Sequence, residues 1–517
     1  MRLLDLLLPD YCGMRDLHLD LRDDSDSPGA VAVLIGRNGA GKSRILHALA
    51  EIFAALYRWN AKKPLDFDFH VVYELGVDAI EVHGAASKPP VVLRSTGGSA
   101  GERIRRADWP NVLPSWMFGY QAVRSSRWDP VFTGDAPRLK AALTRAHPWP
   151  LDTPIEFRPQ RHLLCGADQL PLVVLALATQ WSERFGIHLR DQCGIEGFES
   201  AELTVNGAPF RARATRSWRL SGAVEALFQR LYDSGHFGLI PDLGLSGQDL
   251  TEFRIDISTP EDLTALRAMF GTDLDMFLLL DTLRGVGALT ADVRLRTTSG
   301  SLVRPSELSA GQQQALTILG MLRLQRGSES LFLIDEPDAH FHPEWSQQWY
   351  ADVTSMLEDG QRSQLVATTH DPVLVANVPS SKIRIVRQHT NGSITTAPPG
   401  FDVRGYGVGP LLTSDLYGLA TQLDTATQDL IDRQYELTRT LELDEQEQQE
   451  LDKITNTLRE RGFNTTHRDP AVQLFLAELN WRRRRLRQAH GETEAVLTVE
   501  LAQMVSQLYD DRLTQGL

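Results

Sequence analysis

Residues 30–43 have the sequence AVAVLIGRNGAGKS, an apolar run that leads into a glycine-rich turn. A continuous run of apolar residues is typical of a strand buried in a parallel sheet. After the turn, apolar residues recur at the spacing of one buried helix face. These helix positions are Ile45, Leu46, Leu49, Ile52, Phe53 and Leu56. The order of strand, glycine-rich turn and helix is the first indication of an α/β fold.

The eight residues from Gly36 to Ser43 fit the phosphate-binding P-loop pattern without a mismatch. Glycines let the backbone wrap a phosphate, so that N–H groups and the N-terminus of the following helix point at the anion. Lys42 is predicted to reach the β- and γ-phosphates, and Ser43 to be a ligand of Mg²⁺. An ordinary glycine turn is the alternative, but the flanking strand and helix argue against it. The other predicted nucleotide contacts in the turn are Gly36, Asn38, Gly39 and Gly41.

Later in the chain, apolar runs separated by helix-length segments continue the rhythm of a parallel sheet. These runs are Leu331–Ile334, Leu365–Thr369 and Ile383–Val386. The first run ends in Asp335 and Glu336, followed by a proline. Asp335 is predicted to support the Mg²⁺ site, and Glu336 to polarise a water for in-line attack on the γ-phosphate. Such a tripeptide alone would usually be a solvated turn, but here it follows a buried strand downstream of a P-loop.

A further stretch, 308–313 with the sequence LSAGQQ, resembles the LSxGQ signature of ABC-type and SMC-type ATPases. Thr368-Thr369-His370 is similar to the switch histidine of that family, whose ring senses the γ-phosphate, and residues 338–342 occupy its D-loop position. Gln121, after the apolar run Trp116–Tyr120, is the candidate Q-loop glutamine, which would contact Mg²⁺ or the attacking water. An ordinary loop glutamine is the alternative. The resemblance implies an α/β fold of the ABC-type P-loop NTPase head, with His370 in a catalytic role.

In the family that these motifs resemble, the signature residues act on the nucleotide of the facing protomer. The resemblance therefore implies that Ser309 and Gly311, with Gln312 in the same motif, complete a site in trans. Their N–H and hydroxyl groups, with the N-terminus of the following helix, would stabilise the γ-phosphate. A homodimer or higher oligomer is expected, with ATP and Mg²⁺ as cofactors.

The residues DEPDAHFHP at 335–343 are similar to the DEPExxLHP form of RecF, SMC and OLD-like ATPases. The long arms of SMC proteins are absent, and no pattern after His370 predicts the Toprim nuclease site of OLD proteins. The chain most resembles the PtuA-type ATPase subunits of Septu and some retron anti-phage defence systems, including the stretches 113–127 and 405–407. That resemblance implies a homo-oligomeric ATPase that pairs with a separately encoded nuclease, often of the HNH type.

Three functions remain open at this point. The first is a defence ATPase that gates or scaffolds a nuclease, the second a RecF-like DNA-repair ATPase that binds DNA directly, and the third an assembly protein with structural ATP. The basic cluster Arg482–Arg485, next to Trp481, could be a phosphate-binding stripe for DNA or RNA. The alternative is a helix face paired with the acidic segment Glu442–Glu450 or with a partner protein.

Composition limits these possibilities further. The chain has 517 residues, of which 42% are hydrophobic and 23% charged, and a net charge of −14, which argues against a broadly basic nucleic-acid coat. Cys12, Cys165 and Cys193 lack paired spacing, so neither a disulfide framework nor a zinc site is expected from them. No apolar run approaches the roughly 20 residues of a membrane span. A cytoplasmic protein without a membrane partner is expected.

The expected domains are an ATPase head at 1–410, with an inserted lobe of unpredicted fold at 195–290, and an all-helical region at 411–517. An approximate heptad of leucines runs through 419–441 and predicts a helix. Asp444 with Glu447 is typical of a capping box that starts the next helix, which Gly462 would end. Two more helices are predicted from Asp469-Pro470 and around Leu497–Leu508.

Overall fold

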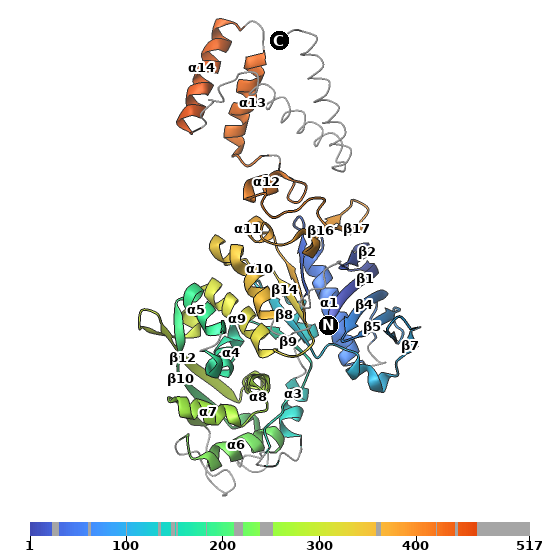
Figure 1. The fold of residues 1–517 in the computed structure, drawn as a ribbon, viewed down its shortest axis with the longest axis vertical. Helices are drawn as coiled ribbons and strands as arrows, with labels where there is room; N and C mark the ends of the chain where they lie inside the picture. Colours follow the sequence, from blue (N-terminus) through green and yellow to red (C-terminus); the bar gives the residue numbers. More distant parts are fainter. Residues whose placement is uncertain are drawn as a thin grey trace. The chain divides into compact units, whose positions relative to one another are not determined.

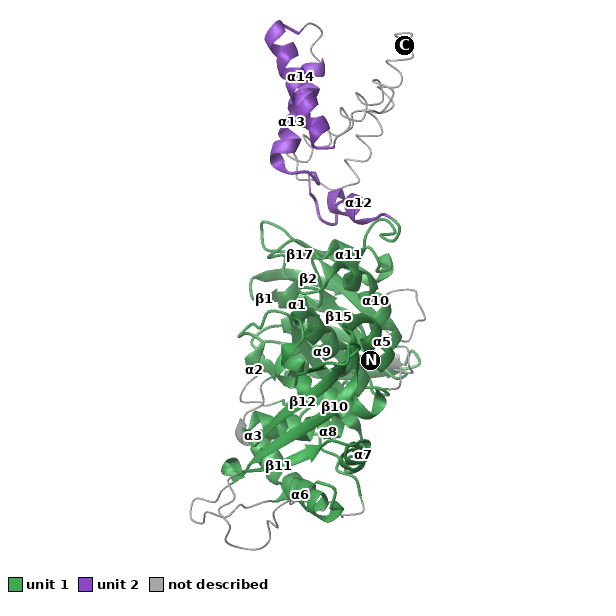
Figure 2. Cartoon of the chain, turned by 90° about the vertical axis from the view of Figure 1, so that its left-hand side faces the viewer, with its two compact units in different colours: residues 1–405 green, residues 406–517 purple. Residues whose placement is uncertain are grey.

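A computed structural model of the chain describes most of its 517 residues, in two compact units at residues 1–405 and 406–517 (Figures 1 and 2). The described residues are 1–22, 30–59, 64–99, 101–132, 136–145, 150, 153–181, 184–210, 221–237, 252–357, 363–419, 421–439 and 443–462. Within these ranges, no helix combines the length and the apolar character needed to cross a bilayer.

The centre of unit 1–405 is a seven-stranded sheet in the order β17-β16-β3-β15-β14-β8-β9. Neighbouring strands pair in parallel, except for the antiparallel pair of β16 and β17. The strands are β3 (Ala30–Ile35), β8 (Trp116–Gln121), β9 (His162–Cys165), β14 (Ser330–Asp335), β15 (Gln364–Thr368), β16 (Ile383–Gln388) and β17 (Ile394–Ala397). Every residue of β14 and β15 is buried, as expected for strands covered on both faces. The parallel sheet predicted from the apolar runs is confirmed.

Helix α1 (Lys42–Tyr57) is packed between this sheet and a second, antiparallel sheet (Figure 1). The second sheet has the order β2-β1-β4-β5-β6-β7. Its strands are β1 (Arg2–Tyr11), β2 (Met14–Asp20), β4 (Phe69–Leu75), β5 (Asp78–Gly84), β6 (Val91–Thr96) and β7 (Glu102–Arg103). Apolar residues of α1 form one core cluster with residues of both sheets; for example, the ring of Phe53 lies edge-on to that of Tyr73, 5.5 Å away. The buried helix face predicted from the sequence is confirmed.

The segment 195–290, for which the sequence predicted no fold, contributes to a four-stranded antiparallel sheet in the order β11-β10-β12-β13. This sheet continues past residue 290, because β12 extends to Thr297 and β13 follows it. Helices α4 and α8 pack against β12. The elements are α4 (Leu170–Leu177), β10 (Ile195–Asn206), α6 (Gly222–Ser234), β11 (Glu252–Ile257), α7 (Pro260–Ala268), α8 (Asp273–Gly285), β12 (Leu289–Thr297) and β13 (Leu302–Val303).

The remaining elements of unit 1–405 connect these sheets. The other α-helices are α2 (Asp129–Phe132), α3 (Ala136–Thr144), α5 (Arg184–Cys193), α9 (Ala310–Leu324), α10 (Pro343–Leu357) and α11 (Pro372–Val375). Short 3₁₀ turns are η1 (Arg106–Asn111), η2 (Ala167–Gln169), η3 (Ala178–Gln180), η4 (Ala208–Phe210), η5 (Pro305–Glu307) and η6 (Ser380–Lys382). Helix α9 packs against α4, α5 and α10, so it links the central sheet region to the antiparallel lobe.

Unit 406–517 is helical in its described part, with α12 (Val408–Thr413), α13 (Thr425–Arg439) and α14 (Glu445–Glu460). Helices α13 and α14 share a small apolar core. The capping box predicted at Asp444 and Glu447 is confirmed, and Gly462 follows the end of α14 with a positive φ of 84°. Arg433 forms an ion pair with Glu450 at 2.9 Å, so the acidic segment already has a basic partner in its own unit.

The leucine heptad predicted a helix that begins too early. Helix α13 begins only at Thr425, so Leu419 and Leu423 lie before it. The side chain of Asp424 accepts a hydrogen bond from the N–H of Thr427 at 2.9 Å, which fixes the start of the helix at this point. The predicted helices at Asp469-Pro470 and Leu497–Leu508, and the basic cluster Arg482–Arg485, lie outside the described residues.

Candidate nucleotide site

Four strands of the central sheet deliver the predicted site residues to one edge. The strands β3, β15, β14 and β8 are neighbours and run in parallel, so their carboxyl ends meet. In the register, Asp335 lies opposite both Thr368 and Gln121. Because β15 separates β3 from β14, His370 comes between the P-loop and Glu336. Ligands of open α/β sheets bind outside this edge.

The P-loop turn depends on glycine at its first position. Gly36, Gly39 and Gly41 all have positive φ, at 152°, 83° and 107°. A Cβ atom on Gly36 would lie 2.3 Å from the carbonyl oxygen of Val386 in β16, much closer than any real contact. The turn therefore needs glycine for its backbone conformation and for the close approach of a neighbouring strand. Helix α1 begins directly after it, at Lys42.

Lys42, His370 and Glu336 form a chain of polar contacts. The buried Nζ atom of Lys42 donates to the carbonyl oxygen of Gly36 at 2.9 Å and lies 2.8 Å from Nε2 of His370. Nε2 of His370 in turn lies 3.3 Å from a carboxylate oxygen of Glu336. Burial lowers the pKa of Lys42 to about 8, although the charges of Glu336 and other carboxylates act against this. Burial, together with the charge of Lys42, also lowers the pKa of His370, which favours a neutral ring.

The predicted Mg²⁺ residues are gathered around the carboxylate of Asp335. The hydroxyl of Ser43 donates to its Oδ1 at 2.9 Å, and the amide of Gln121 lies 3.4 Å from its Oδ2. Gln121 is the last residue of β8, and its side chain faces Asp335. The alternative considered from the sequence was an ordinary loop glutamine. Mg²⁺ prefers oxygen ligands, so the hydroxyl of Ser43 and the carboxylate of Asp335 fit that ion. The amide oxygen of Gln121 accepts from the N–H of Ser125 at 3.0 Å.

Two residues of this cluster had no predicted role. The hydroxyl of Thr368 donates to Oδ1 of Asp335 at 2.6 Å and accepts from the N–H of Glu336 at 3.2 Å. The buried amide of Gln314, on α9, donates to the carbonyl oxygens of Glu336 and Pro337. The signal for Thr368 was its place at the end of a strand next to Asp335. For Gln314 the sequence offered none, because the contact crosses between two distant elements.

The backbone of Glu336 is strained. Its φ is +56°, a region that non-glycine residues rarely adopt. Its N–H donates to the carbonyl oxygen of Thr368 at 3.1 Å, and Gln314 holds its carbonyl oxygen. Such strain is kept where surrounding contacts over-determine the conformation, and it is concentrated at functional sites. The arrangement fixes the direction of the Glu336 side chain.

Asp338, in the D-loop segment, also has a shifted pKa. Burial raises the pKa of Asp338 to about 7, and a hydrogen bond with Thr369 acts in the opposite direction. Burial therefore favours the neutral form of this carboxyl group, as it does for the amine of Lys42.

The signature residues lie at the start of α9, and their side chains are engaged within their own chain. Ser309 is the N-cap and forms a capping box with Gln312, whose side chain also donates to the carbonyl oxygen of Cys193 at 2.8 Å. A Cβ atom on Gly311 would lie 2.6 Å from the carbonyl oxygen of His340. In the described ranges, no hydrogen bond or ion pair joins Ser309 or Gly311 to the P-loop. The structure thus gathers Lys42, Ser43, Gln121, Asp335, Glu336 and His370, and leaves the signature apart from them.

Parts of the chain are similar to known proteins. A family profile described as "AAA domain, putative AbiEii toxin, Type IV TA system" matches residues 212–376, which include the signature, Asp335, Glu336 and His370. The Septu protein PtuA of Bacillus mycoides (strain KBAB4) is 29% identical over 149 residues. The chain is similar to P-loop ATPases of the ABC/SMC type. The match to PtuA covers 26% of this chain and only 20% of that protein.

Among solved structures, the chain is similar to SMC heads. The SMC head domain from Thermotoga maritima has a TM-score of 0.34 and 10% identity, with 78% of this chain and 100% of that chain covered. The SmcHead bound to the C-winged helix domain of ScpA has a TM-score of 0.35 and 12% identity, with 77% and 98% covered.

We predict that Gly36→Ala both destabilises the protein and abolishes nucleotide binding. The added Cβ would meet the carbonyl oxygen of Val386, and the turn would have to move. The matched control is Gly76→Ala: Gly76 also has positive φ, at 62°, but a Cβ there meets nothing within 4 Å. The control should cost only the about 1–2 kcal/mol of a left-handed residue. Urea unfolding and titration with a fluorescent ATP analogue measure the two effects, and equal losses in both variants would contradict the steric argument.

Proposed function

We propose that this chain is the ATPase subunit of an anti-phage defence complex. It binds ATP between two copies of itself and uses the resulting dimerisation to gate or scaffold a separately encoded nuclease. The observation that carries the ATPase part is the contact chain of Lys42, His370 and Glu336 beside Asp335. The similarity to the Septu protein PtuA supports the defence part.

Binding of ATP is proposed to replace contacts that the site now makes with itself. Lys42, which donates to Gly36 and faces His370, would turn to the β- and γ-phosphates. Ser43 and Asp335, with Gln121, would hold Mg²⁺, which neutralises charge on the phosphates when it is bound. The phosphate charge would also favour the protonated form of Lys42, which burial now disfavours. His370, released from Lys42, would then be free to contact the γ-phosphate.

Glu336 is proposed to polarise the attacking water. Its carboxylate is exposed at 39% and lies next to His370, so a water molecule can reach it at the edge of the phosphate site. A general base must lie within hydrogen-bond reach of the proton that it takes up. The constrained backbone of Glu336 would hold its carboxylate in one direction. His370 would orient the same carboxylate, because its Nε2 is 3.3 Å from it.

We predict that Glu336→Gln keeps ATP binding but lowers hydrolysis by roughly a hundredfold to ten-thousandfold. The amide preserves the shape and loses the base, so the ATP-bound dimer should accumulate. Phosphate release measures the first effect and native mass in the presence of ATP the second. Glu102→Gln, at a carboxylate that is 70% exposed on β7, is the matched control and should behave as wild type. Hydrolysis by Glu336→Gln at the wild-type rate would remove Glu336 from this role.

The signature is proposed to complete the site of a second copy. Ser309 caps α9, and Gly311 is held against the D-loop. The N-terminus of a helix favours anions, and in the described part of the chain the start of α9 forms no hydrogen bond with the P-loop of the same chain. An ATP bound at the P-loop of one copy would fill that role for the other.

We predict that two inactive variants restore each other's activity. Lys42→Ala removes the P-loop contact and Ser309→Arg blocks the signature, so each variant alone should be inactive. In an equal mixture, each two-fold dimer of unlike chains has one intact composite site, and about a quarter of the wild-type activity should return. The mixture of each variant with itself is the control. Subunit exchange between the two variants must be demonstrated first. If the activity still does not recover, the sites are not shared between copies.

We predict that the chain co-purifies with a nuclease encoded by a neighbouring gene. Co-expression of the native gene cluster, followed by native mass measurement with and without ATP, tests this. A stable complex whose mass depends on ATP would support the gating function and give its stoichiometry. A lone chain that dimerises with ATP and binds duplex DNA would replace it with a DNA-binding ATPase of the RecF type. Tightly held ATP without phosphate release would favour an assembly protein with structural ATP.

A further inference from the structure

Two histidines and a glutamate gather on the antiparallel sheet at β4 and β5. His70 of β4 lies directly opposite His83 of β5 in the register. Glu81 precedes His83 by two residues and therefore points to the same face of the sheet. This face is the one turned away from the apolar core, because the alternate residues Val71 and Val82 are fully buried. The side chains of His70, Glu81 and His83 are 25%, 42% and 48% exposed, so solvent ions can reach all three.

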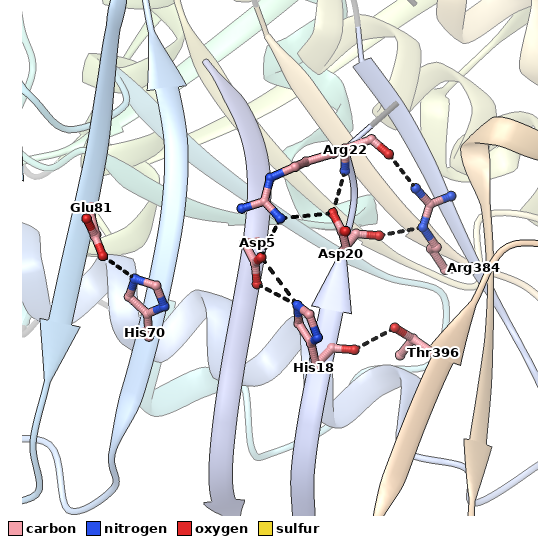
Figure 3. Close-up of polar contacts among 8 residues, drawn as sticks. All are labelled: Asp5, His18, Asp20, Arg22, His70, Glu81, Arg384 and Thr396. Atoms are coloured by element: carbon pink, nitrogen blue, oxygen red, sulfur yellow. Dashed lines mark hydrogen bonds and ion pairs between the residues drawn. The ribbon is translucent and has the colours of Figure 1, made fainter. Parts of the chain in front are cut away.

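The three side chains converge on one point. Oε1 of Glu81 lies 2.8 Å from Nε2 of His70 and 2.8 Å from Nε2 of His83. The two imidazole rings are stacked, with centroids 4.4 Å apart and planes at 12°, and Nε2 of each ring faces the same carboxylate oxygen of Glu81. One ligand atom from each residue lies within 4.8 Å of the other two. Figure 3 shows His70 and Glu81 reaching toward one another from adjacent strands.

A second histidine–carboxylate cluster on the same sheet shows what a closed site looks like. His18 lies 3.2 Å from the carboxylate of Asp5, but Arg22 forms an ion pair with the same carboxylate at 2.8 Å (Figure 3). The guanidinium of Arg22 is permanently charged, so it neutralises Asp5 and repels a cation. In the described part of the chain, by contrast, the polar contacts of the Glu81 carboxylate are with the two histidines. Neither histidine carries the permanent charge of an arginine, so no fixed cation stands beside Glu81 in this cluster.

We propose that His70, Glu81 and His83 bind one divalent cation of the zinc class. Two imidazole nitrogens and one carboxylate oxygen form a ligand set typical of Zn²⁺ sites that keep a position open for water. Bonds of about 2.0–2.2 Å in a tetrahedral arrangement require ligand atoms about 3.3 Å apart. The two separations from Oε1 of Glu81, at 2.8 Å, lie close to this value, and all three ligand atoms lie within 4.8 Å of one another. Rotations of the partly exposed side chains would bring the three atoms to the spacing that the ion requires. Mg²⁺, which prefers oxygen ligands, fits this set poorly.

The site would be independent of the nucleotide site. Its ligands come from the antiparallel sheet, whereas the P-loop and its partners lie at the edge of the parallel one. A bound cation would join β4 to β5 through side chains, in addition to the backbone hydrogen bonds that already pair them. The alternative is an ordinary surface network in which the histidines donate to Glu81 and no metal is needed.

Zinc titration of the full-length protein tests the proposal. The protein is stripped with a chelator and kept free of nucleotide and Mg²⁺, and Zn²⁺ is then added in competition with a chromophoric chelator. The wild type should bind about one more equivalent of Zn²⁺ per chain than His83→Ala or Glu81→Gln. Glu81→Gln is nearly isosteric and can still accept hydrogen bonds, so its fold is preserved. His18→Ala is the matched control, because it removes a histidine from the same sheet at the cluster that Arg22 closes, and it should retain the zinc.

Two further readings separate ligation from folding. Zn²⁺ should raise the unfolding temperature of the wild type and of His18→Ala but not that of the two ligand variants, whose metal-free unfolding temperatures should equal the wild type's. Co²⁺ should give visible absorption bands in the wild type that the ligand variants lack. If the wild type takes up no zinc, or if His83→Ala and Glu81→Gln bind it as tightly as the wild type, the cluster is a surface hydrogen-bond network and the proposal is overturned.

Discussion

The carboxylate of Asp335 is buried at the end of β14, and a buried charge must find partners. Those partners come from three other elements: Ser43 after β3, Thr368 of β15 and Gln121 of β8. One carboxylate therefore contacts residues at or near the ends of three neighbouring parallel strands. The P-loop, the Glu336 turn and His370 all lie at this edge. The order of the strands therefore determines which of these residues are neighbours in the site. Loss of any one partner would leave the others with a poorly satisfied buried charge.

A second set of contacts links this edge to the signature helix. Gln314 of α9 is buried and holds the carbonyl oxygens of Glu336 and Pro337. Ser309 caps the same helix at its start, and Gly311 lies against the D-loop carbonyl of His340. A displacement of α9 must therefore either break these bonds or carry the backbone of Glu336 with it. Within one chain, the helix that would face a second copy is thus mechanically connected to the residue at the phosphate edge.

The sequence was most informative where structure depends on neighbours along the chain. The run 30–43 predicted its strand, turn and helix, and the capping box at Asp444 predicted the start of α14, because the apolar run, the glycine pattern and the cap are each written in residues a few positions apart. It was least informative where structure depends on distant pairings. The four-stranded sheet of β10 to β13 and the contact of Gln314 with Glu336 join segments whose patterns are individually ordinary. The start of α13 was missed because the heptad of leucines outweighed a single local signal, the Asp424 cap.

In the described state, the site satisfies its own charges. Burial lowers the pKa of Lys42 to about 8, while the charge of Glu336 acts in the opposite direction. The ammonium group of Lys42 donates to the carbonyl oxygen of Gly36 and lies beside His370. An arriving triphosphate would compete for the ammonium group and change the partners of His370 and Glu336 together, because the three form one chain of contacts. Binding of the triphosphate would affect both the phosphate site and the signature helix, because Gln314 of α9 holds the carbonyl oxygen of Glu336. A nucleotide-dependent closure needs such a link, because a phosphate can shift an equilibrium only through contacts that differ between the two states.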